Sequence, residues 1–436
     1  MTIEVSELGG EGGARATRAL VLHPDIRGNE RARSAEAALD EAMALARALP
    51  RVALTGGEVV RLPRAHPGTL FGAGKLDEIK ARIEGDDVAL VLVDGPVSPV
   101  QQRNLEKAWG VKLLDRTGLI LEIFADRART REGVLQVELA ALSYQRTRLV
   151  RAWTHLERQR GGLGFVGGPG ETQIEADRRA IDTQMVRLKR QLAKVARTRE
   201  LHRAARRRVP YPVVALVGYT NAGKSTLFNR LTGADVMARD MLFATLDPTM
   251  RAVRLEGGQE VILSDTVGFI SDLPTQLVAA FRATLEEVLE ADLIVHVRDI
   301  SHPETEAQAA DVEAILGDLG VAEGVPRIEL WNKADLLPEG DPAHAVAVRR
   351  EGVFVVSALT GAGLGPALAA MGAALDASRR RERVEIGYDA GRARAYLYEE
   401  GVVEGEEPGD AGTVLQVNWS ALQRRRFEAL LAGGEE

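Results

Sequence analysis

Eight residues, Gly218-Tyr-Thr-Asn-Ala-Gly-Lys-Ser225, have the types and spacing of a loop that holds nucleotide phosphates. An apolar run of strand length, Val213–Val217, precedes them, and a helical pattern follows. Glycines let backbone N–H groups wrap around phosphates, and the start of a helix favours negative charge. We expect Lys224 to bridge the β- and γ-phosphates and Ser225 to bind magnesium. The residues predicted to contact nucleotide here are Gly218, Tyr219, Thr220, Asn221, Ala222, Gly223, Lys224, Ser225 and Thr226.

A second motif, Asp265-Thr-Val-Gly268, ends a predicted β-hairpin over residues 249–264. An acid at the end of a strand after a phosphate loop suits a water-mediated contact with magnesium, and the N–H of Gly268 can sense the γ-phosphate. The motif alone is weak, because a strand-end Asp followed by Gly is common in turns. Asp265, Thr266, Val267 and Gly268 are all included in the predicted site.

The segment Phe243-Ala-Thr-Leu-Asp-Pro248 lies between the phosphate loop and the hairpin. Thr245 can offer its hydroxyl to magnesium and its backbone to the γ-phosphate, with Thr249 as the alternative. An ordinary loop role for Thr245 also stays open. We include Phe243, Ala244 and Thr245 in the nucleotide site, and expect Ser225, Thr245 and Asp265 to hold the metal.

Guanine is indicated by Asn332-Lys-Ala-Asp335, which follows the predicted strand Arg327–Trp331. The carboxylate of Asp335 can accept hydrogen bonds from the ring N–H and the exocyclic amine of guanine. Adenine has no such pair of donors and would leave the carboxylate unpaired. We expect Asn332 to tie the loops together and the stem of Lys333 to cover the base.

A last segment, Ser357-Ala358-Leu359, follows the strand Val353–Val356, and its backbone can meet the guanine oxygen. All these motifs fall in chain order at predicted strand ends, where open α/β sheets bind their ligands. The sequence therefore predicts an enzyme that hydrolyses GTP to GDP and phosphate. The residues predicted to take part in hydrolysis are Lys224, Thr245, Gly268 and Asn221.

Two residues refine this prediction. Phe269 stands where many signalling GTPases have a Gln that orients water, and a hydrophobic side chain cannot do this, so we expect slow intrinsic hydrolysis. Asn221 can coordinate a cation such as potassium beside the phosphates, although simple loop capping explains an Asn there equally well.

Composition limits the class of protein. The chain has 436 residues, enough for several domains, with 45% hydrophobic and 27% charged residues, as in ordinary globular proteins. A net charge of -7 argues against a globally basic nucleic-acid binder. There is no Cys, which excludes disulfides and zinc–thiolate sites and fits a reducing cytoplasm. No secretory signal and no membrane-spanning run is expected.

The chain is predicted to have an α/β fold in four parts. Residues 1–133 alternate strands and helices as a small parallel α/β domain, and 134–209 form a helical hairpin around the glycine-rich segment 161–170. Residues 210–380 hold the doubly wound GTPase domain, and 381–436 a small α+β domain after a charged linker, Arg379–Arg383. Gly72-Ala-Gly-Lys75 lacks the spacing of a phosphate loop and is predicted to be a turn before a helix.

The second helix of the hairpin is strongly basic. A charge run is often only a solvated face, but this bias in an acidic protein raises the odds of a polyanionic partner. The cationic residues are Arg178, Arg179, Arg187, Lys189, Arg190, Lys194, Arg197, Arg199, Arg203 and Arg206–Arg208.

The chain resembles the HflX family of translational GTPases along nearly its whole length. The resemblance rests on Asp115-Arg-Thr-Gly-Leu-Ile-Leu-Glu-Ile-Phe124, on Gly168-Pro-Gly-Glu-Thr-Gln-Ile-Glu-Ala-Asp-Arg-Arg179 and on the Phe243–Pro248 segment. It implies a monomeric cytoplasmic protein, with peripheral membrane association left open. Its N-terminal domain would dock on the large ribosomal subunit, and its hairpin loop would reach ribosomal RNA. Phe165-Val-Gly-Gly168 stands where the family leads us to expect Arg or Lys, so stacking by Phe165 would replace a charge contact.

Two functions remain open at this point. The resemblance implies a GTPase that splits stalled or stress-damaged ribosomes. The alternative is a regulatory GTP switch in ribosome assembly or stress signalling that has no splitting activity. A tRNA-modifying GTPase is a weaker third reading, because the chain lacks the Cys that such enzymes often use.

Overall fold

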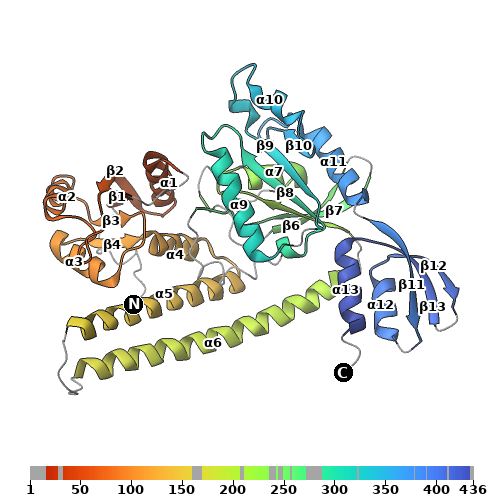
Figure 1. Cartoon of the computed structure of the whole chain (residues 1–436), viewed down its shortest axis with the longest axis horizontal. Helices are drawn as coiled ribbons and strands as arrows, with labels where there is room; N and C mark the ends of the chain where they lie inside the picture. Colours follow the sequence, from red (N-terminus) through yellow and green to blue (C-terminus); the bar gives the residue numbers. More distant parts are fainter. Residues whose placement is uncertain are drawn as a thin grey trace. The chain divides into compact units, whose positions relative to one another are not determined.

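The computed structural model (Figure 1) forms two compact units, which are described separately. Of the described residues, the first unit holds those up to Ala193 together with Leu242 and Phe243, and the second holds the others. The division into four domains therefore stays a prediction. The structure describes residues 16–27, 33–159, 169–206, 211–234, 242–243, 249–255, 258–271, 287–321, 324–377, 379–388, 390–409 and 412–432.

The first unit contains the small parallel α/β fold that the sequence predicted. Its four strands are all parallel in the order β2-β1-β3-β4. The strands are β1 (Thr17–Ile26), β2 (Val52–Leu62), β3 (Leu90–Val93) and β4 (Lys112–Asp115). The helices between and after them are α1 (Ala35–Arg47), α2 (Ala73–Gly85), α3 (Pro99–Trp109) and α4 (Arg116–Arg127).

Local sequence sets where these helices begin. The Ser34 side chain caps α1, and Ser98 forms a capping box with Gln101 at the start of α3. The prediction of a turn before a helix over Gly72–Lys75 was wrong in extent, because only Gly72 precedes α2, as its N-cap, and residues 73–75 form the first turn of this helix. Lys75 pairs there with Glu58 and Glu78, so two carboxylates already engage its ammonium.

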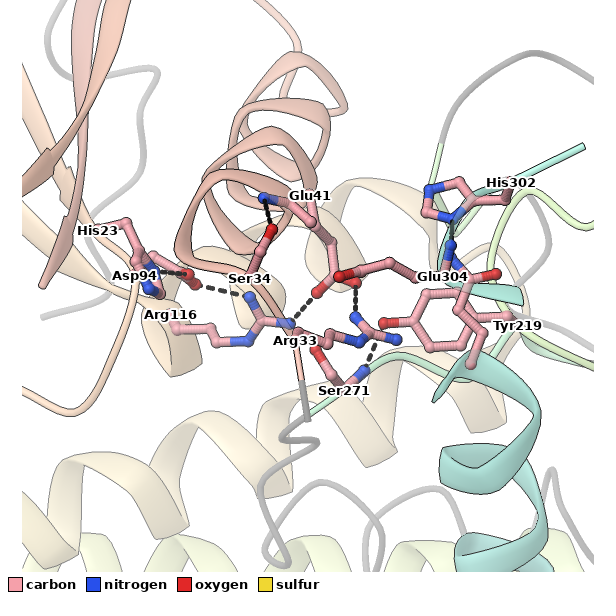
Figure 2. A network of polar contacts seen from close by, with 12 residues as sticks. His23, Arg33, Ser34, Glu41, Asp94, Arg116, Tyr219, Ser271, His302 and Glu304 are labelled. Carbon is pink, nitrogen blue, oxygen red and sulfur yellow. Dashed lines mark hydrogen bonds and ion pairs between the residues drawn. The ribbon is translucent and has the colours of Figure 1, made fainter. Parts of the chain in front are cut away.

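A chain of buried ionic contacts crosses the carboxyl ends of β1, β3 and β4 (Figure 2). Nδ1 of His23 lies 2.7 Å from the Asp94 carboxylate, and Arg116 bridges Asp94 at 2.6 Å and Glu41 at 2.5 Å. Burial favours a neutral Asp94, but the His23 hydrogen bond and the Arg116 charge outweigh it and lower the pKa of Asp94. Arg116 of α4 thus connects Glu41 of α1 with Asp94 at the end of β3, so the network ties both helices to the sheet. Glu41 also pairs with Arg33.

The neighbouring Asp115 attaches the next long helix, α5 (Arg131–Gln159), to this fold. Its carboxylate caps α4 at Gly118 N and accepts hydrogen bonds from Tyr144 Oη at 2.6 Å and Arg148 at 2.9 Å. The Asp-Arg-Thr-Gly motif thus joins the end of the sheet to the middle of α5. An ion pair of 2.7 Å between Arg146 and Asp182 then joins α5 to α6 (Pro169–Arg206), which runs alongside it in Figure 1.

The glycine-rich loop between α5 and α6 falls mostly in residues 160–168, outside the described residues, as does the predicted boundary between residues 209 and 210. Among the residues that the structure describes, no helix is long and apolar enough to cross a membrane.

The second unit is built on a six-stranded sheet in the order β10-β9-β8-β5-β7-β6. All neighbouring strands are parallel except β6 and β7, which form the predicted hairpin. The strands are β5 (Val213–Val217), β6 (Thr249–Arg254), β7 (Glu260–Asp265), β8 (Leu293–Asp299), β9 (Arg327–Asn332) and β10 (Val353–Val355).

Helices cover this sheet on both faces, which explains why its central strands are continuously apolar. Helices α7 (Lys224–Thr232) and α11 (Leu364–Ala377) share one hydrophobic core with it. Helix α9 (Thr305–Leu319) lies in front of the sheet in Figure 1. The short α10 (Pro342–Ala347) and the 3-10 turn η2 (Ala334–Leu336) complete the domain.

The C-terminal part is a small α+β fold, as predicted. Its antiparallel sheet has the order β11-β13-β12, with bounds Arg380–Gly387, Gly412–Trp419 and Val403–Pro408. Helices α12 (Gly391–Glu399) and α13 (Ala421–Ala432) contribute Leu397 and Phe427 to its core. The prediction that Arg379–Arg383 is a linker was wrong, because the pairing of Arg380 with Trp419 and of Arg383 with Gln416 places this run in β11.

Candidate functional site

The phosphate loop runs from the buried strand β5 into α7, and its shape depends on left-handed backbone. Gly223 has a φ of 94°, and a Cβ there would lie 2.2 Å from Nδ2 of Asn332. Asn221 has a φ of 62°, a conformation that Asn tolerates better than most residues. Asn221 is an exposed residue of this loop.

Lys224 is folded into this loop. Its Nζ donates hydrogen bonds to the carbonyl oxygens of Gly218 at 3.0 Å and Tyr219 at 2.8 Å. Burial lowers the pKa of Lys224 to about 8, and the nearby Asp265 opposes that shift only in part. Keeping the ammonium charged here therefore costs free energy. A negatively charged ligand that replaces the two carbonyl groups would remove that cost.

Ser225 and Asp265 form a pair suited to magnesium. The Ser225 Oγ donates to Oδ2 of Asp265 at 2.7 Å, because the pairing of β5 with β7 sets Leu216 beside Asp265. Magnesium in phosphate sites takes one or two protein oxygens and completes its shell with phosphate and water. The described residues contain no group of three or more His, Cys, Asp or Glu that could hold a metal, and such a site needs none.

The rest of the Asp265–Gly268 motif packs against the phosphate loop. Thr266 is fully buried and its hydroxyl donates to the carbonyl of Leu216 at 2.6 Å, so this side chain joins two strands. A Cβ on Gly268 would lie 2.8 Å from the Thr220 Cα, so only glycine fits. The Gly268 backbone consequently lies directly beside the loop and Lys224.

Phe269 is 1% exposed and belongs to the largest fully buried side chains described. Its ring is part of the core and offers no group that could orient water. This agrees with the expectation from sequence that hydrolysis lacks a side-chain donor or acceptor at this position.

Asn332 connects the base loop to the phosphate loop. It is 2% exposed; its Nδ2 donates to the Ala222 carbonyl at 2.8 Å, and its Oδ1 accepts from Ala358 N at 2.8 Å. This is the tie predicted from sequence, and it brings Ser357–Leu359 to the same edge of the sheet.

The residues assigned to the base lie together beside this tie. Oδ1 of Asp335 accepts from the Ser357 hydroxyl at 2.5 Å, and Asp335 is exposed while Ser357 is buried. Lys333 adopts a φ of 64°, and its Nζ lies 2.7 Å from the carboxylate of Asp299. The carboxylate of Asp335 is thus fixed on one side and accessible on the other.

Sequence reasoning missed two supporting residues. Asp299, at the end of β8, holds Lys333 over the loop. Arg230, in α7, donates to the carbonyl oxygen of Ala358 at 2.7 Å and also to that of Leu359. Each partner is more than thirty residues away in the chain, so no local motif could show these contacts.

The segment with the switch threonine is placed only in part. Ala244 and Thr245 lie outside the described residues, and Thr249 is the first residue of β6. Phe243 belongs to the first unit, is 2% exposed and packs edge to face on Phe124 with ring centres 4.6 Å apart. The structure gives this ring a packing role, and the assignment of Phe243 to the nucleotide site stays a prediction.

A phosphate loop, a strand-end Asp beside its Ser, and an Asn-Lys-Ala-Asp loop tied to both are found together on one edge of a mostly parallel sheet. This combination defines a P-loop GTPase. Three family profiles match the chain: "GTP-binding GTPase N-terminal" over residues 36–125, "GTP-binding GTPase Middle Region" over 127–206 and "50S ribosome-binding GTPase" over 213–333.

Curated relatives agree over most of the chain. "GTPase HflX" of Magnetococcus marinus is 51% identical over 359 residues, which cover 82% of this chain and 83% of that protein. "GTPase HflX" of Escherichia coli is 43% identical over 364 residues, 83% of this chain and 85% of that one. The chain belongs to the HflX family of GTPases and is a GTP hydrolase.

Among solved structures, a GTP-binding protein from Sulfolobus solfataricus in complex with GDP has 23% sequence identity and a TM-score of 0.46. The alignment covers 82% of this chain and 99% of that one.

Replacing Asp335 with Asn should change the base that is bound. The variant loses a double acceptor for guanine, so GTP affinity should fall by about 100-fold or more. Xanthine nucleotides should bind better, because their extra carbonyl pairs with the new amide. Competition binding with GTP and XTP measures both effects, and Asp318→Asn, an exposed Asp of α9, is the control. Unchanged GTP affinity in Asp335→Asn would contradict the assignment.

Nucleotide binding should take up a proton at Lys224. Its pKa of about 8 in the free protein must rise beside phosphates, so affinity should fall as the pH rises above 8. Proton uptake should be small at pH 7 and clearly larger at pH 8.5. Calorimetry of GDP binding in buffers of different ionisation enthalpy measures it. Lys224→Arg keeps its charge and should show no uptake; equal uptake at both pH values in wild type would refute the shift.

Proposed function

We propose that this GTPase binds the large ribosomal subunit in the cytoplasm and couples GTP binding and hydrolysis to ribosome dissociation or rescue under stress. GTP hydrolysis itself follows from the family and the GTPase domain. Binding to the ribosome is the part of this proposal that goes beyond GTP hydrolysis. It is supported by the charge of α6 and by the description "50S ribosome-binding GTPase" of the profile that matches the GTPase domain.

The observation that carries the proposal is the exposed cationic face of α6. Seven cationic side chains of its described part are exposed: Arg178, Arg179, Arg187, Lys189, Arg190, Lys194 and Arg197. The acids of the same stretch are Glu175, Asp177 and Asp182, and Asp182 is engaged by Arg146 of α5. Such an excess in a protein of net charge -7 suits contacts with RNA phosphates, which are strong, salt-sensitive and independent of sequence.

A regulatory GTP switch without splitting activity is the second candidate, and the burial of Phe269 favours it. Phe269 offers no group that could orient water, so hydrolysis should be slow and GTP should stay unhydrolysed for longer. Sedimentation of purified ribosomes with the protein and GTP separates the two functions. Dissociation into subunits supports splitting, and stable binding without dissociation supports the switch.

We include two cations in the proposed site. Magnesium would lie against Ser225, the water shell of Asp265 and Thr245, and would neutralise phosphate charge when bound. Potassium would lie at Asn221, an exposed residue of the phosphate loop. Its charge would supply there what an arginine supplies in other GTPases.

Reversing Arg187, Arg190 and Arg197 to Glu should abolish stimulation of GTP hydrolysis by large subunits and spare basal hydrolysis, because none of them belongs to the nucleotide site. If all three contact phosphates, the slope of log affinity against log salt should become shallower by about three units. GTP turnover with and without large subunits, at low and moderate salt, measures this effect. Reversal of three exposed arginines elsewhere, Arg349, Arg380 and Arg392, is the control for net charge. If large subunits stimulate GTP hydrolysis by the α6 variant as strongly as by wild type, the cationic residues of α6 only face solvent and do not contact the ribosome.

Basal hydrolysis should be faster in potassium than in sodium at equal ionic strength, and Asn221→Ala should remove the difference. The reason is that an amide oxygen at this position can complete the shell of a potassium ion beside the phosphates. Initial rates in the two salts measure it. Equal rates for wild type would leave Asn221 as a loop residue.

A further inference from the structure

The pairing of β5 with β7 continues past the ends of both strands into the phosphate loop. Tyr219 and Phe269 form a further parallel bridge. Thr220 N donates to the Phe269 carbonyl at 2.7 Å, and Phe269 N donates to the Gly218 carbonyl at 3.1 Å. The first three residues of the loop are therefore joined by backbone to the residue that follows Gly268.

The Tyr219 side chain adds a contact two residues further on. Its hydroxyl oxygen accepts a hydrogen bond from Ser271 N at 2.7 Å (Figure 2). The residue is 4% exposed, and the intervening Phe269 and Ile270 are 1% and 0% exposed. The stretch from Phe269 to Ser271 is thus held by the core, by the backbone of Gly218 and Thr220 and by the side chain of Tyr219.

These contacts fix Gly268 from both sides. Asp265 before it is held by β7 and by the Ser225 hydroxyl, and Ser271 after it is held by Tyr219. No space is left around Gly268, because a Cβ would lie 2.8 Å from Thr220 and 3.1 Å from Nζ of Lys224. The backbone bonds of Phe269 to Gly218 and Thr220 hold Gly268 beside the loop, and the Tyr219 hydroxyl restrains the chain that follows it.

We propose that Tyr219 is a positioning residue for GTP hydrolysis, acting through the backbone of Gly268. The inference rests on the proposed contact of Gly268 with the γ-phosphate. A site whose next side chain, Phe269, is buried must rely on backbone groups and cations to stabilise the transferred phosphoryl group. Such groups contribute only when they are held in place beforehand, and the Tyr219 hydroxyl holds this one.

The test is Tyr219→Phe in the full chain, which removes the hydroxyl and keeps the ring. The single-turnover rate of GTP hydrolysis should fall about 3- to 10-fold, as expected when one hydrogen bond to a backbone amide is lost. GDP has no γ-phosphate, so its affinity should stay within about twofold of wild type. Hydrogen exchange at Ser271 N should be faster. Tyr398→Phe removes a tyrosine hydroxyl in the C-terminal domain and should change none of these quantities.

Two outcomes would overturn the inference. The first is a wild-type hydrolysis rate in Tyr219→Phe. The second is an equal loss of affinity for GDP and for a GTP analogue, with an unchanged rate at saturation, which would make the hydroxyl a stability contact alone. Lys224→Ala is measured in parallel: wild-type hydrolysis in that variant would reject the proposed nucleotide site itself rather than the role of Tyr219.

Discussion

One buried amide, Asn332, holds the site together. Its amide nitrogen donates to the phosphate loop and its amide oxygen accepts from the loop after β10, both at 2.8 Å. The amide also lies so close to Gly223 that no residue larger than glycine fits at that position. Loops from three different strands therefore share one reference point. Binding of the guanine base and binding of the phosphates therefore depend on each other, because a displacement of this amide would move the loops at both ends of the nucleotide.

Much of the fold could be predicted because its signals are local. Apolar runs of strand length, Ser caps and the Gly257-Gly258 turn identify the strands and helices, and the chain order of strands and helices implies parallel sheets. The error at Arg379–Arg383 has a physical cause. A strand with one solvated face can be rich in arginine, and this run is a strand because it pairs with residues 416–419, far later in the sequence.

The candidate site likewise contains residues that local sequence predicts and residues that only the tertiary structure reveals. Backbone-binding motifs such as Gly218–Ser225 are visible in sequence, because their chemistry dictates residue types at fixed spacing. Arg230, Asp299 and the Tyr219–Ser271 contact are not visible, because each depends on which strand ends meet at the sheet edge. Thr266 shows that a residue inside a recognised motif can have a structural role instead. It lies in the motif for phosphate and metal, but its hydroxyl donates to Leu216 and joins the end of β7 to β5.

The contact between Phe124 and Phe243 links two stretches of sequence that are more than a hundred residues apart. Phe243 has a φ of 55°, an uncommon conformation for a bulky residue, and burial of its ring in the first unit offsets that strain. A smaller side chain at either position would leave a cavity and release the strained backbone. The two positions are therefore coupled in stability although they lie far apart in the sequence: the free-energy cost of shrinking one ring depends on the size of the other.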